Sequence, residues 1–331
     1  MRSVLDDLPA VDETLAADIE KRLVRVEEML RRVVESDYSL LTDTARHLAE
    51  AGGKRFRPML VLLAAQFGDP AAPGVVPSAV VVELTHLGTL YHDDVMDEAV
   101  MRRGRVSANS RWNNTVAILT GDYLFARASD LLADLGPEAV RIQARCFSRL
   151  VQGQIKETIG PEEGADPLAH YLDVVAGKTG SLIAASARLG ALFAGAPASV
   201  VETLTSACEK IGVAFQLSDD IIDVAADSEE SGKTPGTDLR EGIRSLPVLH
   251  ALRSSDATDA RLRELLTSDL SDDARHAEAL ALLRAHPAMD HARADLRRWV
   301  DDARAELATL PDAPAKDAFI ALCDYVLTRT S

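Results

Sequence analysis

Two short acidic clusters carry the residue types best suited to chemistry. The first reads HDDVMD, from His92 to Asp97, and the second reads SDDIID, from Ser218 to Asp223. On a helix, the first and last aspartates of each cluster lie four positions apart and share one face. Proteins hold magnesium through one or two carboxylates together with waters and substrate phosphates. The repeated pattern therefore predicts a polyphosphate bound through magnesium between two acidic helix faces.

The residues before each cluster help to separate a metal site from an ordinary acidic surface. A single Asp-Asp-x-x-Asp run is also typical of a solvated helix face or of the start of a helix. Here both runs follow apolar positions, which are Leu87, Leu90 and Tyr91 in one case and Val213, Phe215 and Leu217 in the other. The apolar flanking residues indicate that both helices pack in the core. Carboxylates on such helices repel one another unless cations neutralise their charge. The flanking residues therefore favour a metal site.

Four basic segments could supply cations to an anionic substrate. Gly52 to Pro58 reads GGKRFRP, Met101 to Arg105 reads MRRGR, Lys178 lies in AGKTG, and Lys233 lies in SGKTPGTD. Taken alone, each is more typical of a basic surface loop. AGKTG also lacks the Gly-x-x-x-x-Gly-Lys spacing of a nucleotide-binding loop, and no strand precedes it. Together with the acidic clusters, the four segments form a set suited to binding one diphosphate through magnesium and a second diphosphate directly.

Composition limits the classes of protein. The 331 residues are 47% hydrophobic and 27% charged, which is ordinary globular chemistry, and the formal charge of −16 argues against nucleic acid or an anionic membrane as a partner. Cys146, Cys208 and Cys323 are far apart, so neither a disulfide framework nor a zinc site is indicated. The acidic N-terminal sequence lacks a signal-peptide pattern, and the apolar stretch from Leu182 to Ala196 is too short to span a bilayer. We expect a cytoplasmic protein without a membrane span.

The pattern of residues predicts an all-α fold, a single large helical bundle. Aromatic residues make up 4%, Ala and Leu abound, and alternating β-branched runs are missing apart from the ambiguous VVPSAVVV at Val75 to Val82. We expect one domain over residues 1–331, with a catalytic core at about 40–252 and peripheral helices at about 256–331. Helices are predicted at 15–34, 40–51, 57–66, 78–91, 110–134, 138–159, 167–176, 179–194, 198–225, 245–253, 259–268, 272–285, 289–309 and 314–329.

The ordered motifs carry a family resemblance. From about Arg46 to Leu252, the order GGKRFRP, THLGTLYHDDVMD, RRG, KTG, FQLSDDIID, GK and GTDL resembles the trans-isoprenyl diphosphate synthases, or polyprenyl synthetases. The resemblance implies a helical fold around a deep central cavity, usually a homodimer. It also implies a Mg2+-dependent condensation of isopentenyl diphosphate with an allylic diphosphate.

The resemblance also implies roles for individual residues. The metal-binding carboxylates would be Asp93, Asp94, Asp97, Asp219, Asp220 and Asp223, with Asp93, Asp97 and Asp219 as direct ligands. The allylic diphosphate would be held by Arg102, Lys178 and Lys233, and isopentenyl diphosphate by Lys54, Arg57, His86 and Arg103, while Gln216 and Thr179 would line the reacting centre. A lone histidine is more often a core residue, but His86 lies seven positions before Asp93 and so shares its helix face. Ile243 departs from the family pattern, which commonly has lysine there; Arg244 could replace that contact.

Product length can be predicted from the helix that leads into the first cluster. In the family, bulky aromatic residues four and five positions before the first aspartate close the pocket, whereas this chain has Thr89 and Gly88 there, with Thr85 and Leu84 deeper. Small residues imply a long product in the heptaprenyl to decaprenyl range, with geranylgeranyl diphosphate as the alternative. A class I terpene cyclase normally has only one Asp-rich motif, and a non-catalytic subunit is expected to have lost carboxylates. Both alternatives therefore fit less well.

Overall fold

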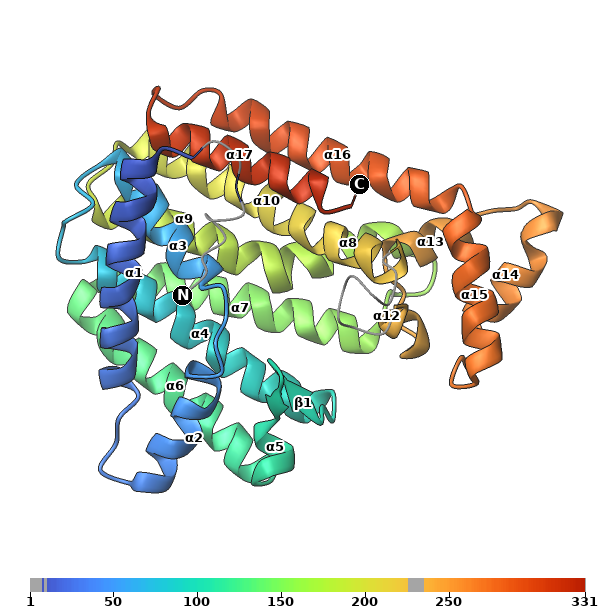
Figure 1. Ribbon diagram of the computed structural model, residues 1–331, viewed down its shortest axis with the longest axis horizontal. Coiled ribbons are helices and arrows are strands. Elements are labelled where there is room, and N and C mark those ends of the chain that lie inside the picture. Colours follow the sequence, from blue (N-terminus) through green and yellow to red (C-terminus); the bar gives the residue numbers. More distant parts are fainter. Residues whose placement is uncertain (1–7, 9–10, 226–234, 331) are drawn as a thin grey trace. The chain divides into compact units, whose positions relative to one another are not determined.

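The chain is helical almost throughout, and the prediction of an all-α protein is confirmed (Figure 1). The computed structural model describes residue 8, residues 11–225 and residues 235–330. Within these residues the strands are two short ones, β1 (Met101–Arg102) and β2 (Arg105–Val106), which pair antiparallel. No helix of the described part is long and apolar enough to cross a membrane.

The chain forms two compact units. Unit 1 draws on residues 1–148, 182–206 and 309–321, and unit 2 on residues 149–181, 207–308 and 322–331. Unit 1 contains α1 (Glu13–Val33), α2 (Ser39–Ala49), α3 (Phe56–Ala64), η2 (Ala65–Phe67), α4 (Val75–Met96), β1, β2, α5 (Ala108–Arg111) and α6 (Asn114–Leu135), with parts of α7 (Pro137–Ile159), α9 (Ser181–Phe193), α10 (Ala198–Ala225) and α17 (Pro314–Thr328). The expectation of a single domain stays a prediction.

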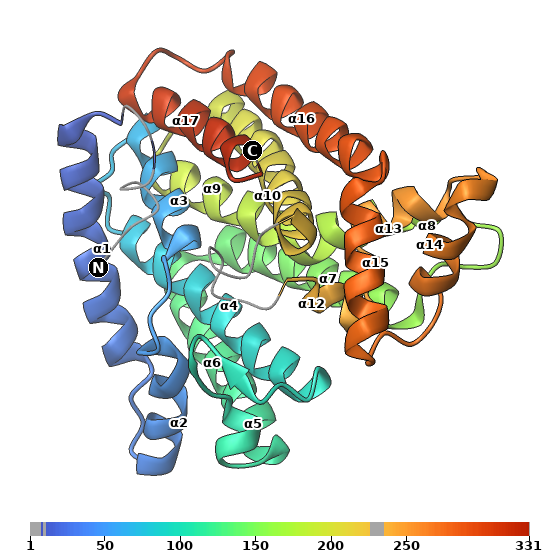
Figure 2. The same ribbon diagram turned by 45° about the vertical axis from the view of Figure 1, so that its right-hand side comes forward.

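Helix α4 is the central element of unit 1. Its β-branched start, VVPSAVVV, is helical, and Val80, Val81 and Val82 are all fully buried. A helix that is apolar on every side is stable when neighbouring helices cover it, so tertiary packing overrides the strand preference of valine here. Figures 1 and 2 show α6 running beside α4, and these two helices are in extensive contact. The first acidic cluster therefore lies at the end of a rigid, buried helix.

Glycine allows α9 to approach α3 closely within unit 1. A Cβ added to Gly190 would lie 2.1 Å from the backbone oxygen of Val61, which is far inside any real contact distance. Only a residue without a side chain fits at such a backbone approach. This packing fixes α3, and α3 in turn carries the GGKRFRP segment at its start.

Unit 2 contains η3 (Ala176–Gly180), which is a π-helical turn, and η4 (Ala257–Asp259), together with the remaining parts of α7, α10 and α17. Its other helices are α8 (Pro167–Val175), α12 (Thr237–Arg240), α13 (Leu246–Leu252), α14 (Ala260–Leu266), α15 (Asp273–Ala285) and α16 (Ala288–Leu307).

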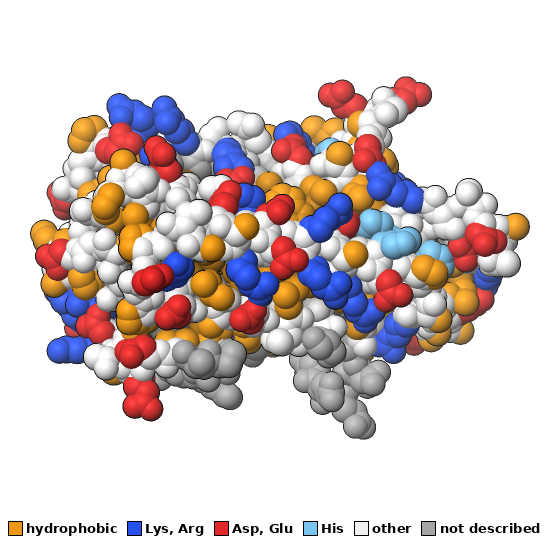
Figure 3. All heavy atoms as spheres, turned by 90° about the horizontal axis from the view of Figure 1, so that it is seen from above, with side chains coloured by type: hydrophobic (Ala, Val, Ile, Leu, Met, Phe, Trp, Pro, Cys, Tyr) orange, Lys and Arg blue, Asp and Glu red, His pale blue; other side chains and the backbone are white. Residues whose placement is uncertain are grey.

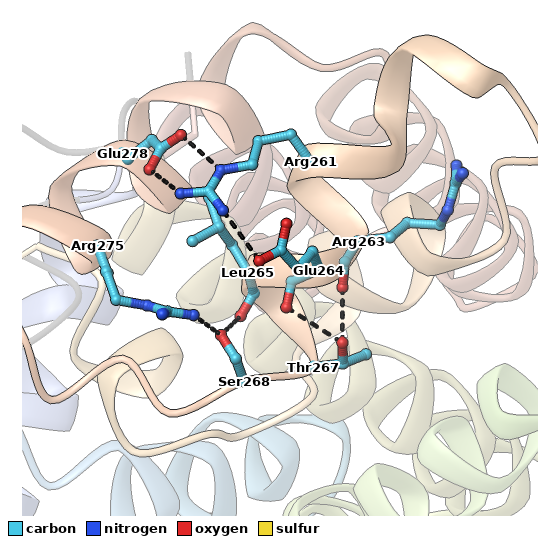
Figure 4. A network of polar contacts seen from close by, with 8 residues as sticks. All are labelled: Arg261, Arg263, Glu264, Leu265, Thr267, Ser268, Arg275 and Glu278. Carbon is cyan, nitrogen blue, oxygen red and sulfur yellow. Dashed lines mark hydrogen bonds and ion pairs between the residues drawn. The ribbon is translucent and has the colours of Figure 1, made fainter.

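Ion pairs join the helices of unit 2 at the surface. Figure 4 shows Arg261 of α14 bound through two nitrogens to Glu278 of α15, at 2.8 and 2.6 Å, and to Glu264 at 3.0 Å. Along α16, exposed pairs such as Arg293 with Asp290 alternate in sign, and Figure 3 shows Lys and Arg interspersed with Asp and Glu over one face. Exposed pairs of this kind contribute little stability each, so the packing of the apolar helix faces holds the unit together.

Candidate functional site

The three aspartates of the first cluster differ in their surroundings. Asp94 is fully buried and accepts a hydrogen bond from Nε of Arg102 at 2.5 Å, whereas the side chain of Asp97 is 57% exposed and lies 3.9 Å from the same guanidinium. Burial raises the pKa of Asp94, and the Arg102 hydrogen bond opposes that rise. Asp93 lies one turn before Asp97, whose N–H donates to the Asp93 backbone oxygen at 2.8 Å. The middle aspartate therefore points inward, and the outer two share the other face.

The RRG motif forms a tight hairpin turn. Arg103 and Gly104 both have positive φ, 50° and 72°, between the paired residues Arg102 and Arg105. Two central residues of positive φ define a type I′ turn, whose twist matches that of paired strands. A non-glycine residue in this conformation is uncommon, so Arg103 accepts local strain to hold its position. The sequence had indicated a loop here but not a hairpin.

Arg103 connects this hairpin to the glycine-rich loop before α3. Its guanidinium donates to the backbone oxygen of Gly52 at 2.7 Å and to that of Leu48, in the last turn of α2, at 3.3 Å. A Cβ on Gly53 would lie 3.1 Å from the guanidinium carbon. The structure thus brings together two basic segments that are about 50 residues apart in the chain.

The cations of GGKRFRP have different roles. Arg55 is buried, adopts a left-handed conformation with φ 46°, and donates to Glu83 of α4 at 2.6 Å and to the Ala49 backbone oxygen at 2.5 Å. It also pairs with Glu27 of α1. This arginine therefore joins four segments of unit 1 and is occupied by protein partners. Lys54 is exposed and Arg57 is half-buried, so these two cations have more solvent access than Arg55.

Arg57 and His86 lie among several arginines and the buried acid Glu83. Burial lowers the pKa of Arg57 to about 10, and its Nε is buried without a hydrogen-bond partner. Burial holds the pKa of His86 well below 6.5, and the charges of Arg57, Arg103, Arg55 and Arg102 lower it further. His86 is therefore neutral at pH 7. Converging cations around a neutral histidine, with an unsatisfied guanidinium donor, are what an anion-binding site requires.

The proposed chain-length positions on α4 face different neighbours. The Thr89 hydroxyl donates to the His86 backbone oxygen at 2.8 Å, and the Thr85 hydroxyl accepts from Nε2 of Gln143 at 2.7 Å. Leu84 is nine positions, or about two and a half turns, before Asp93, which places it on the opposite side of the helix.

Aromatic side chains occupy the space beside Gly88. A Cβ on Gly88 would lie 3.0 Å from the ring of Phe125 on α6, and that ring packs on Phe147 of α7 with centroids 4.5 Å apart. Sequence reasoning missed Phe125, Phe147 and Gln143, because nothing in the sequence distinguishes them from ordinary helix-packing residues.

In unit 2, the middle aspartate of the second cluster is also inward. Asp220 accepts hydrogen bonds from the Tyr171 hydroxyl at 2.5 Å, from the backbone N–H of Leu246 at 3.0 Å and from Nε2 of Gln216 at 3.1 Å. Burial raises the pKa of Asp220 to about 6, against the lowering effect of these donors. Asp220 therefore ties α8 and α13 to α10, as Asp94 ties the hairpin to α4.

The outer aspartates of the second cluster also have protein partners. Nη2 of Arg329 donates to Asp219 at 2.6 Å. Asp223 accepts from the backbone N–H groups of Thr237 and Asp238, at 3.2 Å each, at the start of the short helix α12. Arg329 is a partner that the sequence motif did not suggest, since it lies 110 positions from Asp219.

The AGKTG segment is a π-helical turn between α8 and α9. Such turns often occur at functional sites. Nζ of Lys178 lies 2.7 Å from Glu157, and the Thr179 hydroxyl lies 3.4 Å from Oε1 of Gln216. The structure thus brings Thr179 and Gln216 together in unit 2. Lys233 lies outside the described residues.

The carboxylates suit a hard divalent cation by their chemistry. Among the described residues, no three His, Cys, Asp or Glu side chains converge closely enough to form a ready-made metal cage. Magnesium does not need such a cage, since it commonly takes one or two carboxylates and completes its shell with water and phosphate. Asp93 and Asp97 on α4, and Asp219 and Asp223 on α10, are the residues that would hold such ions.

Comparisons with known proteins identify the family. The family profile described as "Polyprenyl synthetase" matches residues 38–283. The chain is 51% identical over 319 residues to a nonaprenyl diphosphate synthase of Mycobacterium tuberculosis, covering 96% of this chain and 95% of that protein. It is similar to the crystal structure of a geranylgeranyl pyrophosphate synthase from Corynebacterium glutamicum complexed with calcium and isoprenyl diphosphate, with a TM-score of 0.88, 46% identity, and 96% and 98% of the two chains covered.

A second solved structure extends the comparison to a longer product. A decaprenyl diphosphate synthase from Rhodobacter capsulatus matches with a TM-score of 0.87 and 34% identity, covering 96% of this chain and 99% of that one. The fold and site define an all-α isoprenoid synthase. The chain belongs to the polyprenyl synthetase family.

Proposed function

We propose that this protein is an all-trans polyprenyl diphosphate synthase that adds isopentenyl diphosphate to an allylic diphosphate and stops at a heptaprenyl to decaprenyl product. The observation that carries the proposal is the RRG hairpin, whose Arg103 donates to the backbone of the GGKRFRP loop and whose Arg102 donates to Asp94, so that cations of two basic segments lie beside the aspartates of α4. Together with Arg57, whose buried Nε has no hydrogen-bond partner, these cations fit a diphosphate better than a neutral ligand.

The chemistry follows from where charge moves. When bound, a divalent cation, which we take to be Mg2+, neutralises the leaving diphosphate. The allylic carbon–oxygen bond breaks with its electron pair going to the diphosphate, and the double bond of isopentenyl diphosphate attacks the resulting carbocation. The carbocation formed by this addition then loses a proton, which the released diphosphate accepts as the base, and the new double bond of the product forms.

The residue roles remain those that the family resemblance suggests. Lys54, Arg57, His86 and Arg103 would bind isopentenyl diphosphate; Arg102, Lys178 and Lys233 would bind the allylic diphosphate; Thr179 and Gln216 would contact the reacting groups. The six aspartates of the two clusters would bind metal, and the contacts of Asp94 and Asp220, like those of Arg55, support an additional positioning role for these residues.

Geranylgeranyl diphosphate synthesis is the second candidate, and one observation favours it. Phe125 and Phe147 fill the space beside Gly88, so an aromatic wall from α6 and α7 could limit growth although α4 itself carries small residues. Relatives of both kinds occur, namely the nonaprenyl and decaprenyl synthases and the geranylgeranyl synthase. Small residues at both Gly88 and Thr89 favour the longer product.

A homodimer in the cytoplasm completes the proposal. Unit 1 exposes apolar side chains on α6, with Ile118 41% and Leu119 58% accessible, as a dimer interface would require. Cys146, Cys208 and Cys323 are all free and buried, which suits a reducing compartment. Light scattering of the purified protein tests the dimer, and a monomeric mass would contradict it.

The test of function is a product assay. Purified protein is incubated with labelled isopentenyl diphosphate and with dimethylallyl, geranyl, farnesyl or geranylgeranyl diphosphate, with Mg2+ or with EDTA. The products are dephosphorylated and separated by reversed-phase chromatography. We expect Mg2+-dependent polyprenols of 35 to 50 carbons. A 20-carbon product would support the second candidate, a cyclic hydrocarbon would indicate a terpene cyclase, and no product would indicate a non-catalytic subunit.

A further inference from the structure

Arg329 occupies a carboxylate of the second acidic cluster. This residue follows directly after α17, and its Nη2 lies 2.6 Å from Oδ1 of Asp219 on α10. Its guanidinium stacks 4.4 Å above the ring of Phe215, one helical turn before Asp219, and lies 5.7 Å from the ring of Tyr325. All four residues belong to unit 2. An arginine from the end of the chain therefore holds the first aspartate of the SDDIID motif.

The pair has features that an ordinary surface ion pair lacks. The Arg329 side chain is only 23% exposed, and Nη1 is buried without a hydrogen-bond partner. Buried guanidinium N–H groups normally donate hydrogen bonds. Nη1 of Arg329 has no acceptor, so this guanidinium can form a further hydrogen bond. The stacking on Phe215, at 4.4 Å, is a contact of the guanidinium that does not involve Asp219. The guanidinium can thus give up the carboxylate and keep its position over the ring.

The two clusters differ in which aspartate the arginine takes. In unit 1, Arg102 makes its short contact with the buried middle residue Asp94, and Asp97 is 3.9 Å away. In unit 2, the middle residue Asp220 is satisfied by Tyr171, Leu246 and Gln216, and the arginine instead binds Asp219, whose side chain is 43% exposed. Arg329 and a metal ion would therefore use the same outer carboxylate.

We propose that Arg329 is a positioning residue that acts as the resident counter-ion of Asp219 in the metal-free protein and yields this carboxylate to a divalent cation. Without a cation, Asp219 and Asp223 would repel each other across one helix turn, and Arg329 offsets that repulsion. When a metal binds, the ion takes over this role, so the arginine and the metal compete. The inference rests on the proposed function only in assuming that the second cluster binds metal.

The test is a titration with Mn2+ in the absence of any prenyl substrate. Asp93→Asn and Asp97→Asn are both introduced so that the first cluster does not contribute, and the dissociation constant is measured by electron paramagnetic resonance of free Mn2+. Arg329→Gln should bind Mn2+ about fivefold more tightly, because a competing charge has been removed. Arg329→Lys keeps the charge and should remain close to the parent. Arg293→Gln, which removes an exposed arginine of the same unit that pairs with Asp290, is the matched control and should leave the constant unchanged.

A thermal unfolding series separates this role from simple packing. Arg329→Gln should lower the melting temperature in EDTA, and the loss should shrink in saturating Mn2+, when the ion replaces the arginine. Adding Asp219→Asn should abolish the effect of Arg329→Gln on Mn2+ affinity. Unchanged or weaker Mn2+ binding in Arg329→Gln would overturn the proposal, as would an equal loss of stability with and without metal. Because no step requires product formation, a protein that shows the expected competition but makes no polyprenol refutes the proposed function alone.

Discussion

The two acidic clusters have almost the same letters but are built from different parts of the chain. In the first, the partner of the buried Asp94 is Arg102, eight positions away in a hairpin that directly follows α4. In the second, Asp220 is held by Tyr171 and by the N–H of Leu246, and Asp219 is held by Arg329, 110 positions away. The first cluster is thus a local motif and the second a tertiary assembly. A substitution far away in the sequence can therefore disturb the second cluster more than the first, although the two motifs are nearly identical.

The largest expected loss of turnover follows substitution of the outer aspartates of the two clusters. Asp93→Ala and Asp219→Ala should each lower kcat by roughly 10³-fold or more, because in the proposed function each removes a charge that would hold a divalent cation against the leaving group. Circular dichroism melting should show an intact fold for both. An active variant at either position would show that only the other cluster is needed, and an unfolded one would make that aspartate structural.

The middle aspartates should behave in the opposite way. Asp220→Ala leaves a buried tyrosine hydroxyl, a backbone N–H and an amide without their acceptor, so urea unfolding should show a loss of about 2–4 kcal/mol. Asp94→Ala leaves Arg102 without its short contact and should cost less, because that side chain is closer to solvent. Equal losses of unfolding free energy in the two variants would mean that the contacts of Asp94 and Asp220 stabilise the protein to the same degree.

Substrate affinity should distinguish the cations around each cluster. Lys54→Ala and Arg57→Ala, near the first cluster in unit 1, should raise KM for isopentenyl diphosphate by about 10- to 100-fold, which is the loss of one charge-assisted hydrogen bond. Lys178→Ala in unit 2 should instead raise KM for the allylic substrate. Steady-state kinetics with each substrate varied in turn measures both. If every variant weakens both substrates equally, the assignment of cations to separate diphosphates is wrong.

The smallest effect on rate is expected at the chain-length positions. Thr89→Phe should shorten the product and preserve the first condensation, because the ring takes hydrocarbon volume and leaves the charged groups intact. Gly88→Phe should do the same only if Phe125 can move, since even a Cβ there would lie 3.0 Å from its ring. Phe215→Leu, four positions before Asp219 as Thr89 is before Asp93, is the matched control and should leave product length unchanged. Chromatography of the dephosphorylated products measures all three, and an altered length in the control would place the determinant outside α4.

Much of the fold follows from local patterns. The periodicity of apolar residues predicted the helix at 198–225 with the same ends as α10, and the helices at 138–159 and 167–176 to within a residue. Elements decided by neighbours were harder to predict. The valines before the first cluster became helical because other helices bury them on all sides, and the RRG segment became a hairpin although Arg103 must adopt a positive φ.

The sequence by itself determined the residue types and their order, and these were enough to recognise the family. Helix periodicity also determined that the outer aspartates of each cluster share a face, since spacing along a regular helix needs no tertiary information. Only the tertiary structure decided that Arg55 is a buried partner of Glu83, that Asp94 and Asp220 point inward, and that Arg329 binds Asp219. These outcomes depend on burial and on contacts between distant segments. The sequence does not show whether a charged side chain is exposed or buried. Burial makes an unpaired charge costly, so its partner is decided only when the chain folds.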